Sequence, residues 1–202
     1  MKKGANFSCG GVLMKDVLKE LARKKRRNRT VVNMSETKHN TSSAPYASRD
    51  DFRRVFHEET DSLYRLSFLL TADTQKAQQC FVSGLEDSVN GSLVFKEWAH
   101  SWARRTIIQN AVRTINPRPM EEYAPSSFDG GGTPLAAEEI ETAAVLQLEP
   151  FERFIYVMSV LECYSDLDCS VLLGCARRDV IAARMRALQQ IEMQSTLASV
   201  AG

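Results

Sequence analysis

Apolar residues recur every three or four positions from residue 50 onward, which places them on one face of a helix. The spacing predicts helices within 50–88 and over 95–115. Asp73 or Thr74 is the expected N-cap of the helix that crosses residue 80. The positions expected to be buried in this half are Phe52, Val55, Phe56, Leu63, Leu66, Leu70, Ala77, Phe81 and Leu85.

Three aromatic residues, Phe95, Trp98 and Trp102, share one face of the helix predicted over 95–115. Their spacing favours packing in a core. The alternative is that the two Trp residues, which lie next to Arg104 and Arg105, stack on unpaired bases. Pro117 is expected to end this helix, which we predict to be the longest in the chain.

A segment rich in Pro, Ser and Gly follows at 116–134, and residues 115–143 carry a net charge of −5. This composition is typical of a flexible acidic linker. Helical patterns then return, with Pro150 at a helix start and with two last helices at about 166–173 and 177–191. The predicted fold class is all-α: two small helical bundles joined by a flexible acidic linker, the second ending in a helix-turn-helix. The predicted parts are a basic tail, a first helical domain, the linker and a second helical domain, at 1–48, 49–115, 116–134 and 135–202.

The charge of the chain is strongly segregated although its net value is +1. Residues 1–33 hold ten Lys and Arg against two acids, a net charge of +8, so residues 34–202 carry −7. We expect the tail to be disordered, and Met34 is an alternative natural start to Met1. Residues 115–143 account for −5 of this charge, so the remaining predicted helical parts are roughly neutral. A roughly neutral folded part argues against a large phosphate-binding surface.

The five cysteines include no CxxC pair, and their spacing fits no common zinc site. Most lie in apolar or amphipathic surroundings, so we expect structural thiols and no metal. An odd count without a signal peptide or a membrane-spanning segment indicates a reducing cytoplasm and no membrane association.

Residues suited to catalysis are scattered. The three His residues are far apart, and the "DGGG" at 129–132 has no Lys of a phosphate loop after it. We therefore predict that the chain is not an enzyme and needs no cofactor or small-molecule substrate.

The last two predicted helices have the residue types of a helix-turn-helix. Such a motif requires a small residue where the helices cross, Gly in the turn and a branched residue packing inward. Ser170, Gly174 and Val180 stand at these positions. A plain helical hairpin could carry the same pattern.

Two stretches resemble the extracytoplasmic-function class of bacterial sigma factors of RNA polymerase. The segment "LQLEPFERFIYVMSVLECYSDLDCSVLLGCARRDVIAARMRAL" is similar to region 4 of that family. The segments "DSLYRLSFLLTADTQKAQQCFVSGL" and "FKEWAHSWARRTIIQNAVR" are similar to its region 2. The resemblance covers about residues 52–190 in the family's order.

The resemblance implies a DNA-binding protein that binds core RNA polymerase and directs transcription initiation at promoter DNA, with an anti-sigma factor as a further partner. It implies polymerase contacts from Gln78, Gln79, Val82 and Ser83. It implies DNA contacts from Arg177, Arg178, Ile181, Arg184, Arg104 and Arg105.

The chain also departs from the family's pattern. Gln79 and Val82 replace an Asp and a Gln on the polymerase-facing surface, and Asp179 stands where Thr is usual. An Asp in the first turn caps a helix but repels phosphate. The alternative function is therefore a sigma-like adaptor that binds polymerase or a regulatory protein without driving initiation. Two stripes compete for burial in the last helix, namely Val180, Ala183, Ala187 and Ile191 against Ile181, Met185 and Leu188.

Overall fold

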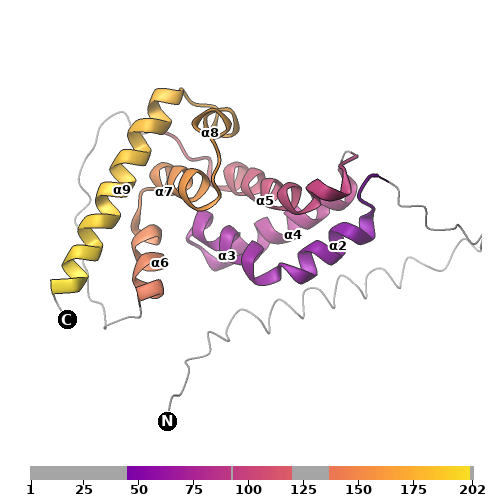
Figure 1. The fold of residues 1–202 in the computed structure, drawn as a ribbon, viewed down its shortest axis with the longest axis horizontal. Helices are drawn as coiled ribbons and strands as arrows, with labels where there is room; N and C mark the ends of the chain where they lie inside the picture. Colours follow the sequence, from indigo (N-terminus) through magenta and orange to yellow (C-terminus); the bar gives the residue numbers. More distant parts are fainter. Residues whose placement is uncertain (1–44, 92, 120–136, 201–202) are drawn as a thin grey trace, which may run out of the picture. The chain divides into compact units, whose positions relative to one another are not determined.

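The computed structural model describes residues 45–91, 93–119 and 137–200, and within these ranges the regular secondary structure is helical (Figure 1). Helix α2 (Arg49–Glu58) begins at Ser48, whose hydroxyl accepts from the Asp51 N–H at 3.2 Å. The Asp51 carboxylate accepts from the Ser48 N–H at 2.8 Å. This reciprocal pair is a capping box and fixes where the helix starts.

The helical pattern over 50–70 is divided between two helices. α3 (Thr60–Thr71) begins directly after Glu59, where the backbone leaves helical geometry with φ −101° and ψ 21°. The Thr60 hydroxyl donates to the Phe56 and His57 carbonyls at 2.7 and 2.9 Å, which satisfies the end of α2 locally. The apolar positions expected in the core on both sides of this break are buried.

Helix α4 (Thr74–Asn90) packs closely against α5 (Ala99–Ile115). Asp73 is the N-cap of α4 and accepts from the Lys76 N–H at 2.9 Å. A Cβ added at Gly84 would lie 3.0 Å from the Ile107 side chain, so glycine permits this approach. A short 3₁₀ turn, η1 (Lys96–Trp98), precedes α5, and α5 ends at Asn116 in the left-handed conformation.

Residues 45–48 belong to the folded part, and their assignment to a disordered tail was wrong. The Ala47 N–H donates to the Val94 carbonyl at 2.7 Å, and the Lys96 N–H donates to the Pro45 carbonyl at 3.0 Å. This pairing includes an isolated antiparallel bridge between Tyr46 and Phe95. The remainder of the predicted tail, and residues 120–134 of the predicted linker, lie outside the described residues.

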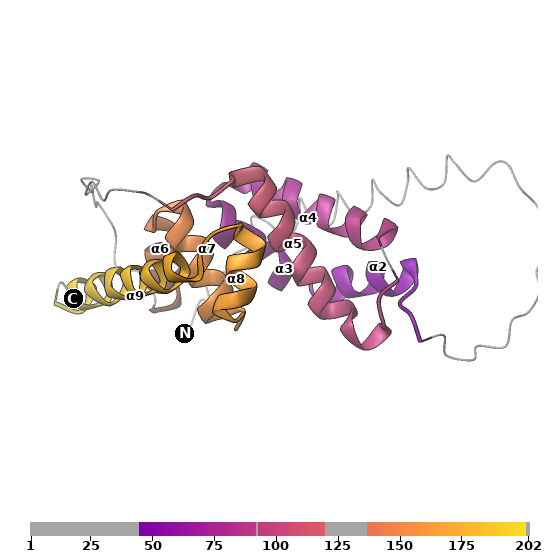
Figure 2. The same cartoon turned by 90° about the horizontal axis from the view of Figure 1, so that it is seen from above.

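The second half of the chain contains α6 (Ala137–Gln147), α7 (Pro150–Tyr156), the π-helical segment η2 (Val157–Leu161), α8 (Asp166–Leu173) and α9 (Arg177–Val200). Pro150 occupies the first turn of α7, as predicted. The last helix is 24 residues long, so α9 and not α5 is the longest described helix. α9 lies along α6 and α7, with α8 near its N-terminal end (Figure 2).

The two halves contact each other, because residues 45–202 form one compact unit in which α3 contacts α6 and α7. Arg153 of α7 is buried and donates to the Leu70 carbonyl of α3 at 3.3 Å and to the Leu148 carbonyl at 3.0 Å. Burial lowers the pKa of this guanidinium. Among the described helices, none combines the length and apolar character that crossing a bilayer requires.

Candidate functional site

The connection between α8 and α9 is a tight turn at Gly174. Gly174 has φ +64° and ψ 38°, and the Cys175 N–H donates to the Ser170 carbonyl at 3.1 Å. A Cβ at Gly174 would meet nothing within 4 Å, so the positive φ and not space requires glycine here. Ser170 and Val180 are buried on either side of the turn. The three residue types expected at this turn therefore occupy the positions that the pattern predicted.

Asp179 caps the start of α9. Its carboxylate accepts from the Ala176 N–H at 3.3 Å and lies 3.6 Å from Nε of Arg178. The N-cap residue Ala176 has no polar side chain, so Asp179 takes over part of the capping. Asp179 therefore places a negative charge in the first turn of α9, next to the exposed side chain of Arg178.

The buried register of α9 follows the first of the two competing stripes. Val180, Ala183 and Ala187 are completely buried. Ile181 is 39% exposed, and Met185 and Leu188 are exposed as well. The small residues at 183 and 187 allow α9 to approach α7 closely. This close packing explains why their stripe is buried, although its side chains are smaller than those of Ile181, Met185 and Leu188.

The arginines of α9 divide into two groups. Arg184 forms an ion pair with Asp166 of α8, and Arg186 forms one of 2.6 Å with Glu152 of α7. These two guanidiniums tie α9 to its neighbours. Arg177 and Arg178 remain on the surface, and the Arg178 side chain is 89% exposed. Of the predicted DNA contacts in this helix, Arg177, Arg178 and Ile181 are therefore accessible, while Arg184 is engaged within the protein.

Arg104 of α5 is also engaged. It donates to Glu162 at 2.6 Å and to the Ser62 hydroxyl at 2.6 Å, and it lies 3.6 Å from Glu59. The neighbouring Arg105 is half-buried and acts electrostatically on Tyr164, whose pKa is raised mainly by burial. The two arginines predicted to contact DNA from α5 thus face the segment between η2 and α8.

An aromatic cluster lies on the surface beside the start of α5. The rings of Tyr46 and Phe95 are stacked at 4.9 Å, and Phe95 meets Trp98 edge to face at 5.2 Å. Trp98 is 58% exposed, so the expectation that it packs in the core was wrong. The buried face of α5 is formed instead by three alanines and two isoleucines, namely Ala99, Ala103, Ile107, Ile108 and Ala111. Of the predicted aromatic face, only Trp102 is half-buried.

The four residues predicted to contact polymerase lie on the side of α4 away from its core. Gln79 is exposed, and Gln78, Val82 and Ser83 are half-buried. The opposite face of the helix packs inward through Ala77, Cys80, Phe81 and Leu85. The structure thus leaves a helical surface of neutral side chains available for a partner.

No known family model matches the chain. The curated proteins contain no significant match either.

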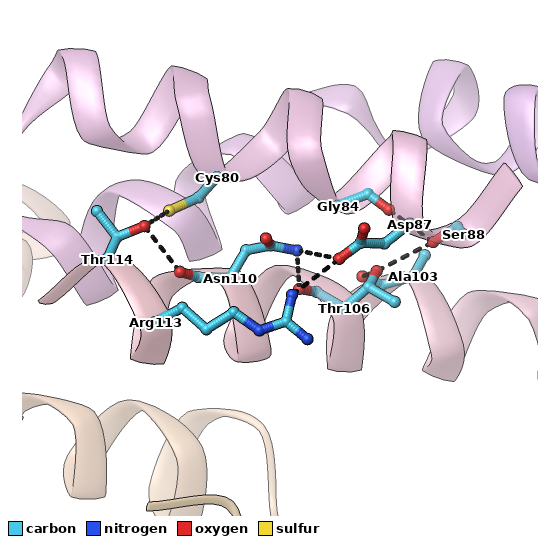
Figure 3. A network of polar contacts seen from close by, with 9 residues as sticks. All are labelled: Cys80, Gly84, Asp87, Ser88, Ala103, Thr106, Asn110, Arg113 and Thr114. Carbon is cyan, nitrogen blue, oxygen red and sulfur yellow. Dashed lines mark hydrogen bonds and ion pairs between the residues drawn. The ribbon is translucent and has the colours of Figure 1, made fainter. Parts of the chain in front are cut away.

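A polar network joins α4 and α5, and sequence reasoning missed it (Figure 3). The Asn110 amide donates to Asp87 at 3.0 Å and to the Thr106 carbonyl at 2.9 Å, and Arg113 lies 3.1 Å from the same carboxylate. The Ser88 and Thr106 hydroxyls are 3.0 Å apart in the core. A polar residue on the apolar side of α5 was the available signal, because buried polar groups require partners.

The cysteines differ in their environments. Cys80 and Cys169 are buried, and Cys175 is half-buried, in agreement with a structural role. Cys163 is exposed and adopts φ +56°, contrary to the expectation of an apolar environment. Burial raises the pKa of Cys169 to about 11, with Asp166 and Asp168 adding to the shift. Within 45–91, 93–119 and 137–200 no three His, Cys, Asp or Glu side chains are grouped to hold a metal.

Proposed function

We propose that this protein is a sigma-factor-like DNA-binding protein that binds core RNA polymerase and directs transcription initiation at specific promoters. In this proposal α2–α5 form the polymerase-binding half. The helices α6–α9 form the DNA-binding half and end in a helix-turn-helix. Residues 116–134 are the linker between the two halves.

The observation that carries the proposal is the combination of the Gly174 turn with the exposed basic start of α9. The left-handed Gly174 and the buried Val180 fix how α8 and α9 meet at the turn. Arg177, Arg178 and Ile181 then face outward from the first two turns of α9. Helix-turn-helix proteins contact base edges and phosphates with residues from this part of the second helix.

The aromatic cluster of Tyr46, Phe95 and Trp98 supports a nucleic-acid role for the first half. Exposed rings of this kind stack on unpaired bases, and each stacked base contributes about 1–3 kcal/mol. The cluster is held by main-chain hydrogen bonds between residues 45–47 and 94–96, so the rings are pre-positioned. Lys96 lies beside the rings in sequence, and its Nζ is 3.9 Å from the Asp51 carboxylate, so its positive charge is partly neutralised.

A second function, a sigma-like adaptor that binds polymerase or a regulatory protein without driving initiation, is favoured by a different observation. Arg104 and Arg184 are held in ion pairs with Glu162 and Asp166, which removes two of the six predicted DNA contacts from the surface. Gln79 and Val82 at the proposed polymerase-binding surface also favour the adaptor, because neither supplies the carboxylate that is usual there in the family.

Run-off transcription with purified core polymerase on genomic promoter fragments separates the two functions. The initiation proposal expects transcripts that depend on this protein, together with polymerase retained in a pull-down. Polymerase binding without any transcript would leave only the adaptor. Loss of both would contradict the initiation function and the polymerase-binding form of the adaptor, and would leave only an adaptor for a regulatory protein.

The DNA contacts are tested by fluorescence anisotropy of the full chain on a promoter duplex with competitor DNA. Replacing Arg177 and Arg178 together by Ala should weaken binding by at least tenfold and reduce its salt dependence by up to two phosphate contacts. The matched control is the double variant Arg53→Ala and Arg54→Ala, which removes two partly exposed arginines from α2. Equal losses in both double variants would show a general charge effect and contradict the assigned site.

A further inference from the structure

The outward face of α9 carries an apolar stripe that no described residue covers. Ile181, Met185 and Leu188 are 39%, 58% and 44% exposed. Their spacing of four and three residues places them in one line along the helix, as in the seam of a coiled coil. The opposite face of the same helix is already buried against α7, so these side chains add nothing to the core of the chain.

The two ends of the stripe carry opposite charges. Arg177 and Arg178 are exposed at its N-terminal end, and Glu192 is exposed one turn beyond Leu188. Among the described residues Arg177 and Glu192 form no ion pair, and Arg178 is only 3.6 Å from the neighbouring Asp179. A helix with an apolar centre, a basic start and an acidic end is complementary to a reversed copy of itself.

We propose that α9 docks on α9 of a second copy of this chain in an antiparallel pair. Met185 lies near the centre of the pair, and the apolar stripes of the two copies cover each other. Arg177 and Arg178 of each copy then lie at the end where Glu192 of the other copy is exposed. A parallel pair would place like charges together at both ends, which costs free energy.

The intramolecular ion pair of Arg184 makes this arrangement compatible with the charges at its centre. Arg184 flanks Met185, so two Arg184 residues approach each other near the twofold axis. Asp166 neutralises Arg184 within each copy through the two terminal guanidinium nitrogens, the longer contact being 3.5 Å. The repulsion that two bare guanidiniums would exert at the axis is therefore reduced.

The stripe is about two helical turns long, which is shorter than the interface of a permanent dimer. We therefore expect a reversible dimer that forms over roughly 10–500 µM and dissociates on dilution. Ile181, Arg177 and Arg178 are also the accessible DNA contacts proposed for α9. Dimer formation would thus compete with DNA binding. Only this competition rests on the proposed function; the dimer itself does not.

Sedimentation velocity of the full chain across this concentration range tests the dimer directly. The wild-type chain should shift toward the mass of two copies, and Met185→Glu should remain monomeric. Met193→Glu is the matched control, because Met193 is 65% exposed on the same helix but lies about 140° around it from Leu188. A wild-type chain that stays monomeric throughout the range would overturn the proposal, as would equal dissociation in both variants.

Charge exchange tests the antiparallel orientation. The variant that combines Arg177→Glu, Arg178→Glu and Glu192→Arg should dimerise with itself but not with the wild-type chain, because an antiparallel mixed pair places like charges together at both ends. Association of this variant with the wild-type chain, without self-association, would show a parallel pair and overturn the antiparallel one.

Fluorescence anisotropy on a DNA duplex tests whether DNA, rather than a second copy of the chain, covers the stripe. If Met185→Glu weakens DNA binding while the wild-type chain is monomeric, the stripe faces DNA and the dimer is overturned. A dimer without any DNA binding would instead contradict the proposed function and leave the dimer standing.

Discussion

Arg104 and Glu162 form an ion pair of 2.6 Å between residues 58 positions apart in the sequence. The Arg104 side chain comes from α5, and Glu162 directly follows η2, so the pair connects the two halves of the folded chain. Ser62 and Glu59 lie on the other side of the guanidinium. A residue predicted to contact DNA is thereby held by the half of the protein that the sequence assigned to a separate domain.

Glu162→Gln removes the closest carboxylate of Arg104, which keeps Ser62 and Glu59 as partners, and should make part of its charge available for phosphate. We expect the full chain to bind a duplex about twofold to tenfold more tightly at low salt, because one further phosphate contact becomes available. Fluorescence anisotropy at several salt concentrations measures this change. Asp50→Asn is the control, since it also removes one carboxylate from an arginine pair, on α2. An equal increase in the control would indicate a general effect of net charge.

Asn110→Ala should lower the free energy of unfolding by about 1–3 kcal/mol. The change removes two hydrogen bonds of a buried amide and leaves the Asp87 carboxylate with only the exposed Arg113. Arg113→Ala in the same network should cost less than about 0.5 kcal/mol, because this guanidinium is 66% exposed and an exposed ion pair stabilises little. Urea unfolding followed by circular dichroism compares the two variants. Equal losses would show that the buried amide has no special role.

Cys163 should be the first described thiol to react with a disulfide reagent at pH 8, and Cys169 should resist it. Cys163 is exposed, whereas Cys169 is fully buried and has a pKa raised to about 11. At pH 8 only about a thousandth of the Cys169 thiol is thiolate. The experiment uses a Cys9→Ser background and mass mapping of the labelled peptides. Labelling of Cys169 as rapid as that of Cys163 in the folded protein would contradict the structure.

The stability of the fold should depend on pH in the acidic range through the carboxylate of Asp51. The Ser48 N–H and hydroxyl lower the pKa of Asp51 below its ordinary value of 3.8, and Lys96 and Arg54 add to this. Its contribution is therefore fully present above pH 3.8 and is lost as the pH falls through the lowered pKa of the folded state.

Asp51→Asn should lower Tm by about 1–3 °C at pH 7 and should converge on the wild type as the pH falls through the lowered pKa of Asp51 in the folded state. Thermal melts across this pH range check the convergence. Asp50→Asn serves as the control, because the adjacent Asp50 side chain is 83% exposed and no capping bond holds it. A constant difference between Asp51→Asn and the wild type at all pH values would contradict the lowered pKa.

The sequence determined the features that depend on neighbouring residues. The periodicity of Phe52, Val55 and Phe56 identified a buried face, and Asp73 and Gly174 marked a helix start and a turn. Such signals work because capping, positive φ and amphipathic spacing are all satisfied within a few residues. The sequence alone also supplied the resemblance to sigma factors, which the transcription and binding experiments can test.

Only the tertiary structure decided which of several equivalent side chains are accessible. Trp98 lies on the surface because the face of α5 that carries Ala103 and Ile107 is the one that packs in the core. Ile181 is exposed because Ala183 and Ala187 fit against α7. Arg104 and Arg184 form ion pairs because the carboxylates of Glu162 and Asp166, from other segments of the chain, lie next to them. A single helix cannot specify these outcomes, since burial and ion pairing depend on what other helices bring to its surface.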